Sequence, residues 1–551
     1  MELNRSKILI ISIVMLFILS RFFGLGQLYF QDEYRWVTIV SGEFGKLDSP
    51  HPPVTEVLYS LAGKAFGYHN LRTLPFIISI FCLILIYLIS SKLSRSNKTA
   101  YIAIGLFVIN TYSLIANLQI DMDGAILPFF VLLSYYFYLR AIKDRDKRFI
   151  LPFVIAMTGG FLTKLSFILF VGALAAEYLL TVYEAGNLKV YFKRIATLFG
   201  IIFISVSAMY FFYGSTDPLF VSHATEFKVF DFATRAYFDL FLRLFKFLIW
   251  FSPLLILPTI LGIFKKEIFN RYRVWYIYIL FNLLFYLVIF DFATLPIERY
   301  FMFIIGPAVI IAADVIYSLV LKLNMSDRFK VNKKYLLIGV AGLALLTIFT
   351  VVVGHEVIPL NPKEAYVDKV KFFDFNFLIP LTGGSGPIGF YASAQFIFWT
   401  WVVCAIGLLF SRKIWAIYLF LIFGLGYNIL LSNEHLFGSF YGSVNNITKQ
   451  SVDYVLNNKD IKEVITYYDA GVYYLRLGGK YSARFYTAPT RDYSVRINAY
   501  RGHYMIVDFP AIDKNSQYWK LISRCKLDKK FTDKYVDSYI FDCRSLPPDT
   551  P

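Results

Sequence analysis

Apolar runs of about 20 residues recur along this chain between Ile8 and Leu431, and they limit the folds open to it. Such a run has the length of a helix that crosses the hydrocarbon core of a bilayer. Hydrophobic residues make up 57% of the 551-residue sequence and charged residues only 17%, whereas soluble domains carry roughly 25% charge. The sequence therefore predicts a polytopic α-helical membrane protein.

We predict thirteen membrane spans, at residues 8–25, 73–91, 101–118, 125–141, 149–163, 166–183, 195–213, 245–264, 274–292, 301–321, 335–353, 391–410 and 414–431. Basic residues cluster in every second loop, near Arg5 and within 92–98, 140–148, 189–194, 265–273, 328–334 and 412–413. Short loops rich in Lys and Arg stay in the cytoplasm. We therefore expect a plasma-membrane protein with a cytoplasmic N-terminus and an exported C-terminus. This topology explains the net charge of +17 without nucleic-acid binding.

The chain divides into a predicted transmembrane domain, residues 1–431, and a tail, residues 432–551. The long outer segments of the first part are 26–72, 214–244 and 354–390. In the tail, a helix-like stretch from Thr448 to Asn458 is followed by strand-like runs at 463–468, 472–477, 504–507 and 539–541. This alternation predicts an extracytoplasmic α/β domain. Its two cysteines, Cys525 and Cys543, would form a disulfide in an oxidising compartment, and free thiols remain the alternative.

Acidic pairs stand at the outer ends of predicted spans. Asp32 and Glu33 follow the first span, and Asp121 and Asp123 occupy the next outer turn. An acid at a bilayer edge is costly unless it faces a water-filled cavity or a partner. An ordinary interfacial acidic pair is the alternative interpretation. The His51-Pro52-Pro53 motif that follows the first pair favours a functional loop, because the two prolines fix the backbone beside the imidazole ring.

Two cations lie in outer loops against the general charge bias. Lys164 ends a Gly160-Phe161-Leu162-Thr163 stretch, and Arg299 precedes a predicted span. Snorkelling to the headgroups would explain Lys164, and a pair with Glu298 would explain Arg299. Ammonium and guanidinium groups also suit a phosphate, while a carboxylate suits a hydroxyl that must lose its proton. A protonated His51 would add a third cation to this outer edge.

The stretch Asp32-Glu33-Tyr34-Arg35-Trp36, followed by Ser49-Pro50-His51-Pro52-Pro53-Val54, resembles the first outer loop of the GT-C membrane glycosyltransferases. The most similar groups are the protein O-mannosyltransferases, which share the histidine before the prolines, and the lipid A aminoarabinose transferases, which share Arg-aromatic after Asp-Glu. Further segments that are similar, in order along about 300 residues, are 71–75, 123–127, 160–164 and Arg299-Tyr300 with Pro307.

The resemblance implies an inverting transfer of a hexose or pentose from a polyprenyl-phosphate donor to an acceptor hydroxyl or phosphate at the outer face. It assigns catalysis to Asp32 as general base, with Glu33 beside it and Asp123 in support. It assigns substrate binding to a second set of residues, namely His51, Lys164 and Arg299 on the phosphate, Tyr300 next to Arg299, Asp121 as the alternative to Asp123, and Arg72 as a brace of the loop.

The partners that the resemblance implies are a lipid-linked sugar donor, the membrane, and a protein, lipid or glycan acceptor, with no nucleic acid. It requires no cofactor and leaves a divalent metal open. Asp121-Met122-Asp123 departs from the family pattern because it lacks the basic residue that often precedes the acid.

Two other classes of function are compatible with a polytopic chain. A transporter or flippase of lipid-linked saccharides often has matching halves and broken helices at the bilayer midplane. In this sequence no halves match, and the polar residues gather at the outer edge. A sensor whose tail binds a ligand would leave the Asp32-Glu33 and His51-Pro52-Pro53 motifs unexplained. The sequence therefore favours the glycosyltransferase.

Overall fold

The computed structural model describes residues 2–44, 49, 51–197, 200, 207, 211, 237, 244, 247–289, 298–324, 332–359, 364–381, 386–467, 471–485, 504–507 and 511–545. Most of the predicted outer segment 214–244 and most of the predicted span 195–213 lie outside these residues. The chain forms two compact units, Met1–Arg21 with Trp36–Ser326 and Phe22–Arg35 with Asp327–Pro551. The predicted boundary between residues 431 and 432 differs from this division and stays a prediction.

Among the described residues, six helices are long and apolar enough to cross a membrane, at Thr73–Ser94, Met122–Lys143, Leu165–Glu184, Arg299–Leu321, Lys333–Val352 and Ile414–Phe437. Shorter apolar helices cover Asn97–Ile109, Pro253–Ile263, Arg273–Leu287 and Ala394–Leu409. Helices satisfy their own backbone hydrogen bonds, which the bilayer core demands. The chain is thus a helical integral membrane protein, as predicted, and the number of thirteen spans stays a prediction.

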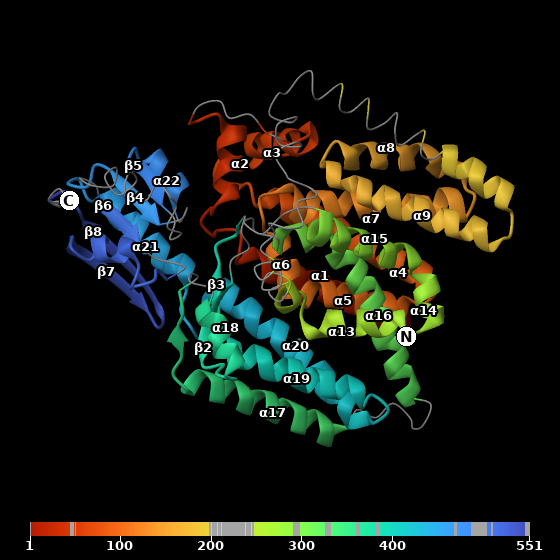
Figure 1. Ribbon diagram of the computed structural model, residues 1–551. Coiled ribbons are helices and arrows are strands. Elements are labelled where there is room, and N and C mark those ends of the chain that lie inside the picture. The colour runs from red at the N-terminus through yellow and green to blue at the C-terminus, as the bar shows by residue number, and fades with distance from the viewer. Residues whose placement is uncertain are drawn as a thin grey trace. The chain divides into compact units, whose positions relative to one another are not determined.

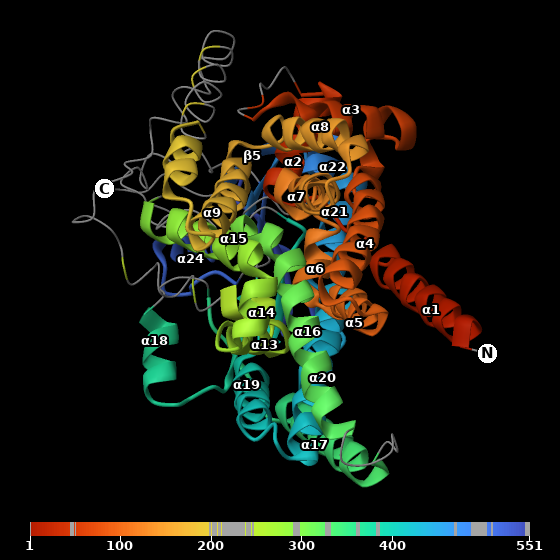
Figure 2. The ribbon, with the colours of Figure 1, turned by 90° about the vertical axis from the view of Figure 1, so that its right-hand side faces the viewer.

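The first unit is helical in its described parts. Its longer helices are α1 (Glu2–Phe22), α3 (Pro53–Phe66), α4 (Thr73–Ser94), α5 (Asn97–Ile109), α7 (Leu127–Tyr138), α8 (Ile150–Phe161), α9 (Ile168–Glu184), α13 (Pro253–Ile263), α15 (Arg273–Leu284) and α16 (Ile305–Asn324). Helix α2 (Asp32–Ser41) begins in the second unit and belongs to the first from Trp36 onward. Its short helices are η1 (Tyr68–Asn70), α6 (Thr111–Ala116), η2 (Met122–Ile126), η3 (Leu139–Lys143), η4 (Lys147–Phe149), η5 (Leu165–Phe167), α14 (Lys266–Arg271), η6 (Phe285–Ile289) and η7 (Glu298–Ile304). Helix α4 packs between α5 and α7, α16 packs against α5 and α13, and α9 packs against α15 (Figure 2).

A buried arginine joins two of these helices. Arg21, in the last turn of α1, is fully buried and donates hydrogen bonds to the carbonyls of Phe107 and Val108. Helix α5 ends at Ile109, so these carbonyls belong to a last turn that lacks partners within its own helix. The negative end of the helix dipole also favours a cation there. Arg21 therefore caps α5, which accounts for a charge at this buried position.

The described part of the second unit contains three apolar helices, α17 (Lys333–Val352), α19 (Ala394–Leu409) and α20 (Ile414–Phe437), which pack on one another. A small sheet lies in the predicted outer segment 354–390. Its strands are β1 (Glu356–Val357), β2 (Phe377–Leu381) and β3 (Phe390–Ser393), with β2 parallel to β1 and antiparallel to β3. The same segment carries α18 (Glu364–Lys371).

The tail forms a five-stranded sheet with the strand order β5-β4-β6-β8-β7 (Figure 1). The strands are β4 (Val464–Tyr467), β5 (Tyr481–Phe485), β6 (Tyr504–Val507), β7 (Lys526–Asp533) and β8 (Val536–Asp542), and the helices are α21 (Val444–Asn457), α22 (Val472–Leu477) and α24 (Gln517–Ile522). Strand β4 runs parallel to β5 and β6, and β8 runs antiparallel to β6 and β7.

The two faces of this sheet are covered by different helices. Ile540 of β8 packs in a core with Val455 of α21 and Leu475 of α22. Its neighbours Tyr539 and Phe541 contact Trp519 of α24 instead, as expected from side chains that alternate along a strand. The predicted strand at 472–477 is wrong, because this run is the helix α22. A short apolar run cannot be told from a buried helix by its pattern alone.

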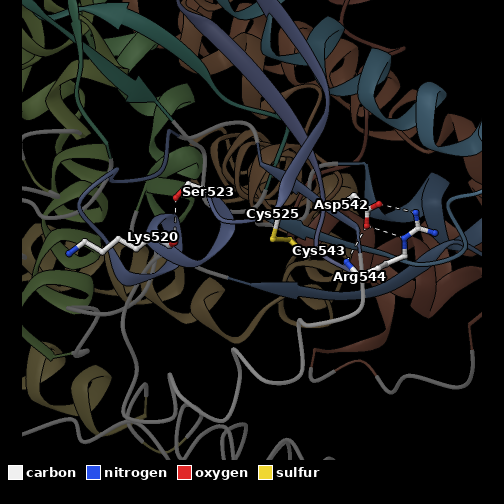
Figure 3. Close-up of a disulfide and its surroundings, with 6 residues drawn as sticks. All are labelled: Lys520, Ser523, Cys525, Asp542, Cys543 and Arg544. Atoms are coloured by element: carbon white, nitrogen blue, oxygen red, sulfur yellow. Dashed lines mark hydrogen bonds and ion pairs between the residues drawn. A yellow bond between two sulfur atoms is a disulfide. The ribbon is translucent and has the colours of Figure 1, made fainter. Parts of the chain in front are cut away.

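A disulfide closes the open end of the β7–β8 hairpin. Cys525 precedes β7, Cys543 follows β8, and their Cα atoms lie 4.8 Å apart (Figure 3). Next to it, Arg544 holds Asp542 with an Nη2–Oδ2 distance of 2.8 Å. Of the two alternatives left open by the sequence, the structure contains the bonded pair.

Candidate active site

The turn that bears Asp121 and Asp123 lies in the first unit, where Asp121 precedes η2 and Asp123 lies in the first turn of η2. The Asp121 carboxylate accepts a hydrogen bond of 2.6 Å from the backbone N–H of Met122 and so caps η2. Gly124 allows η2 to approach the end of α6, because a Cβ atom at this position would lie 2.2 Å from the carbonyl oxygen of Ala116. Asp121 and Gly124 therefore fix the backbone that carries the two carboxylates.

Two buried side chains hold the backbone of this turn. Arg72 donates from Nη1 to the carbonyl of Leu118 at 2.8 Å, and Tyr59 donates from its hydroxyl to the carbonyl of Asp121 at 3.1 Å. Both side chains are fully buried. Arg72, for which a substrate-binding or bracing role was predicted, makes a bracing contact. Tyr59 was not predicted, since an aromatic residue on α3 carries no signal in the sequence.

Lys164 forms a tight ion pair with Asp123. Its Nζ lies 2.7 Å from both carboxylate oxygens, and the side chains are 12% and 1% exposed. Burial would lower the pKa of the Lys164 ammonium, but the surrounding groups, with the Asp123 carboxylate first among them, raise that pKa above its usual range. Lys164 is therefore a cation that is paired in a nearly enclosed site.

Arg299 pairs with the other acid of the turn. The Arg299 Nη1 lies 3.6 Å from Asp121 Oδ2, and its Nη2 donates to the Tyr300 hydroxyl at 2.7 Å. The Tyr300 ring centroid lies 4.5 Å from Lys164 Nζ and 4.7 Å from Arg299 Cζ. Both cations thus contact one aromatic ring, which is attractive through the ring quadrupole. Tyr286 stacks on Tyr300 at 5.2 Å and supports it, and the sequence did not reveal this residue.

This cluster of Asp121, Asp123, Lys164, Arg299 and Tyr300, the paired-charge cluster, alternates acids and cations in a largely buried setting. Desolvated cations form strong charge-assisted hydrogen bonds to an anion. The carboxylates keep both cations in place and limit the penalty of burying them. In chemical terms, the cluster suits the binding of an anionic group such as a phosphate ester.

The segment that follows His51 is hydrogen-bonded to the residues just before Lys164. The backbone N–H of Val54 donates to the carbonyl of Leu162 at 3.0 Å, which joins the His51-Pro52-Pro53 segment to the loop that carries Lys164. The His51 ring stacks on Trp36, with centroids 6.1 Å apart and planes at 20°. Pro53 begins α3, a position where the absent N–H of proline is no loss.

Asp32 and Glu33 belong to the second unit, where they begin α2. The Asp32 side chain is half-buried, whereas Glu33 is fully buried. The Glu33 carboxylate accepts a hydrogen bond from the backbone N–H of Phe30 at 3.1 Å. The two neighbouring acids therefore have different surroundings, and Asp32 is the one left accessible to solvent.

Within the described ranges, no group of three or more His, Cys, Asp and Glu side chains is arranged to hold a metal ion. The described acids of the paired-charge cluster are engaged by Lys164 and Arg299. The geometry therefore assigns no ligand set to a divalent metal.

Residues 50–210 match the family of dolichyl-phosphate-mannose-protein mannosyltransferases. No curated protein matches the chain in sequence. Among solved structures, apo ArnT from Cupriavidus metallidurans aligns over 100% of both chains at 13% identity, with a TM-score of 0.52. ArnT bound to undecaprenyl phosphate aligns over 99% of both chains at 14% identity and the same TM-score. The alignment with the Archaeoglobus fulgidus oligosaccharyltransferase covers 90% of this chain and 69% of that protein, at 10% identity and a TM-score of 0.41.

The predicted resemblance to GT-C membrane glycosyltransferases is thereby confirmed. The likeness to ArnT shows the fold, and the family match falls on the segment that contains His51, Asp121, Asp123 and Lys164.

The hydrogen bond from Arg72 to the Leu118 carbonyl should stabilise the folded protein. We expect Arg72→Ala to lower the free energy of unfolding by about 1–3 kcal/mol, because a buried carbonyl loses its donor. Chemical unfolding of the purified protein in detergent measures this. Arg412→Ala, which removes an exposed arginine, should change it by less than about 0.5 kcal/mol. An unchanged unfolding midpoint for Arg72→Ala would contradict the bracing role.

Proposed function

We propose that the chain is a glycosyltransferase that moves a hexosyl or pentosyl group from a polyprenyl-phosphate donor to an acceptor at the outer membrane face. The observation that carries the proposal is the paired-charge cluster, in which Lys164 and Arg299 meet at Tyr300 beside buried carboxylates. The family match supports the reaction class, and the ArnT fold is compatible with it.

The cluster would stabilise the leaving group. When the acceptor oxygen attacks the anomeric carbon, the bond from that carbon to the phosphate oxygen breaks and its electron pair stays on the phosphate. The polyprenyl phosphate leaves with an additional negative charge. Fixed cations in a water-poor site stabilise a charge that develops in the transition state. Lys164 and Arg299 are suited to this because both are mostly buried and already oriented, and His51 would assist them.

Asp32 would take the proton of the acceptor hydroxyl. A general base must reach the acceptor, and Asp32 is half-buried while Glu33 is enclosed. Asp123 is engaged by the Lys164 ammonium through both oxygens, which suits it to hold that cation. Attack from the side opposite the phosphate inverts the anomeric configuration. Glu33 would then support Asp32 through the turn it stabilises.

The comparisons bear on the carrier and the acceptor. The matched family is described by dolichyl-phosphate-mannose and protein, and one matched ArnT structure holds undecaprenyl phosphate. Dolichyl and undecaprenyl chains are both polyprenyl carriers. We therefore propose a polyprenyl-phosphate sugar as donor and a protein, lipid or glycan hydroxyl or phosphate as acceptor. The reaction needs no cofactor in this scheme.

We also propose that the N-terminus is cytoplasmic and that the tail, residues 432–551, is an extracytoplasmic domain. The alternating basic loops support this orientation. The Cys525–Cys543 disulfide supports it independently, because disulfides persist in oxidising compartments.

The role of Asp32 is tested by Asp32→Asn, which keeps the shape of the side chain and removes its basicity. We expect turnover to fall by roughly 10²–10⁴-fold, the usual contribution of a general base, while the affinity for a polyprenyl-phosphate analogue is kept. Sugar transfer by the purified protein measures the first and titration the second. Asp453→Asn, at an exposed position on α21, is the matched control. Near-normal turnover of Asp32→Asn would refute the assignment.

The phosphate site is tested by binding. Removing one partner of a buried ion pair leaves the other charge unpaired, so we combine Lys164→Gln with Asp123→Asn. We expect this double variant, and Arg299→Lys, to bind a polyprenyl-phosphate analogue about 10-fold or more weakly, since each charge-assisted hydrogen bond contributes about 1.5–3 kcal/mol. A lysine cannot reproduce the planar fork of arginine.

Arg271→Lys provides the matched control for the binding test, because Arg271 pairs with Asp314 at 2.7 Å elsewhere in the first unit. Its affinity for the analogue should equal that of the wild type. If the Lys164→Gln/Asp123→Asn variant and Arg299→Lys also bind the analogue as tightly as the wild type does, Lys164 and Arg299 serve only as anchors at the headgroups.

The orientation is tested with thiols and fusions. In intact cells, we expect Cys525 and Cys543 to react with a membrane-impermeant maleimide only after reduction, because they are bonded and outside. Cys82 and Cys404 are buried and should stay unlabelled. A reporter fused after Asn433 should be active only outside the cytoplasm. Cytoplasmic activity of that fusion would overturn the proposed topology.

A further inference from the structure

The segment that leads to Asp32 is folded into the second unit, together with the tail. The side chain of Gln27 donates to the carbonyl of His435 at 3.1 Å, and the backbone N–H of Leu28 donates to Asn445 Oδ1 at 2.9 Å. Phe30 is fully buried in a core that also contains Val444 and Ile447 of α21. These contacts anchor the segment before α2 begins.

Helix α22 of the tail contacts both ends of this segment. The Tyr29 ring lies 5.2 Å from that of Tyr473 and 6.1 Å from that of Tyr474. Arg476 donates a hydrogen bond from Nη1 to the hydroxyl of Tyr34. Its guanidinium carbon also lies 5.8 Å from the centroids of the Tyr34 and Tyr481 rings. Tyr34 follows Asp32 in the first turn of α2, so the contact fixes the turn that carries the carboxylate.

Gly386, which precedes β3, also lies close to this turn. Gly386 has a φ of +101°, and a Cβ atom at this position would lie 2.2 Å from Glu33 Cδ. The backbone can approach Glu33 this closely only because residue 386 is glycine. Glu33 therefore stabilises this turn through the hydrogen bond from Phe30, and Arg476 stabilises it through the hydrogen bond to Tyr34.

We propose that Arg476 is a positioning residue for Asp32, acting through Tyr34, and that α22 is the element of the tail that sets the direction of the proposed base. The inference rests on the role of Asp32 in the proposed function. A displacement of about 1 Å at a reacting group can lower a rate about 10²-fold. A guanidinium that also contacts two tyrosine rings is held more firmly than a single hydrogen bond would hold it, because the cation is attracted to both rings.

The proposal is tested in the full-length protein with Arg476→Ala, Tyr34→Phe and the double variant. We expect kcat to fall by about 10-fold or more in Arg476→Ala, while the KM for a polyprenyl-phosphate sugar and the unfolding midpoint stay near wild type. Since the two residues act as one unit, the double variant should be no slower than the slower single variant. Arg476→Lys keeps a donor for the Tyr34 hydroxyl and should recover part of the loss.

Arg544→Ala is the matched control, because it removes a tail arginine that pairs with Asp542 inside the tail. It should leave kcat unchanged. Tyr34→Phe removes a single oxygen atom and keeps the test decisive if Arg476→Ala folds poorly. A kcat within twofold of wild type for both Arg476→Ala and Tyr34→Phe, or additive losses in the double variant, would overturn the positioning role.

Asp32→Asn distinguishes a failure of the positioning role of Arg476 from a failure of the proposed function. If Asp32→Asn is inactive while Arg476→Ala and Tyr34→Phe turn over normally, only the positioning role fails. If Asp32→Asn also turns over normally, the proposed function itself fails, because the general base lies elsewhere.

Discussion

The ion pair between Lys164 and Asp123 is the interaction on which the arrangement of the first unit's site depends. Both side chains are nearly enclosed, and a buried charge without its partner would cost several kcal/mol. The backbone must therefore keep the Lys164 ammonium and the Asp123 carboxylate within contact distance of each other. Arg72, Tyr59 and Gly124 provide this by fixing the turn before α7. The second pair, Arg299 with Asp121, then uses the other carboxylate of the same turn.

This pairing also has a consequence for selectivity. Because each cation already has a carboxylate, a small anion gains little by entering the cluster, since it must compete with a fixed partner. A phosphate ester that is tethered to a polyprenyl chain stays in the plane of the membrane, so its local concentration near the cluster exceeds that of free phosphate. The carboxylates keep the two cations oriented.

The charged residues of the candidate site were easier to predict from the sequence than the residues that hold them in place. Polar residues at the ends of apolar runs are conspicuous, so Asp121, Asp123, Lys164 and Arg299 could be identified and are found together. Tyr59 and Arg476 were missed because a single tyrosine among 41, or an arginine in a basic chain, has no distinguishing pattern. The run 472–477 was assigned to a strand for the same reason, since only its packing on α21 and β5 decides that it is a helix.

The division of the chain at residue 35 separates two roles. The proposed phosphate ligands are held by contacts within the first unit. The residues around Asp32 are held by contacts within the second unit, to α21, α22 and Gly386. Donor binding and proton removal would therefore depend on different sets of supporting residues. A change in the tail would alter the acceptor step and leave donor affinity intact. The tail, which carries no motif of its own, would in this way contribute to catalysis through the geometry of Asp32.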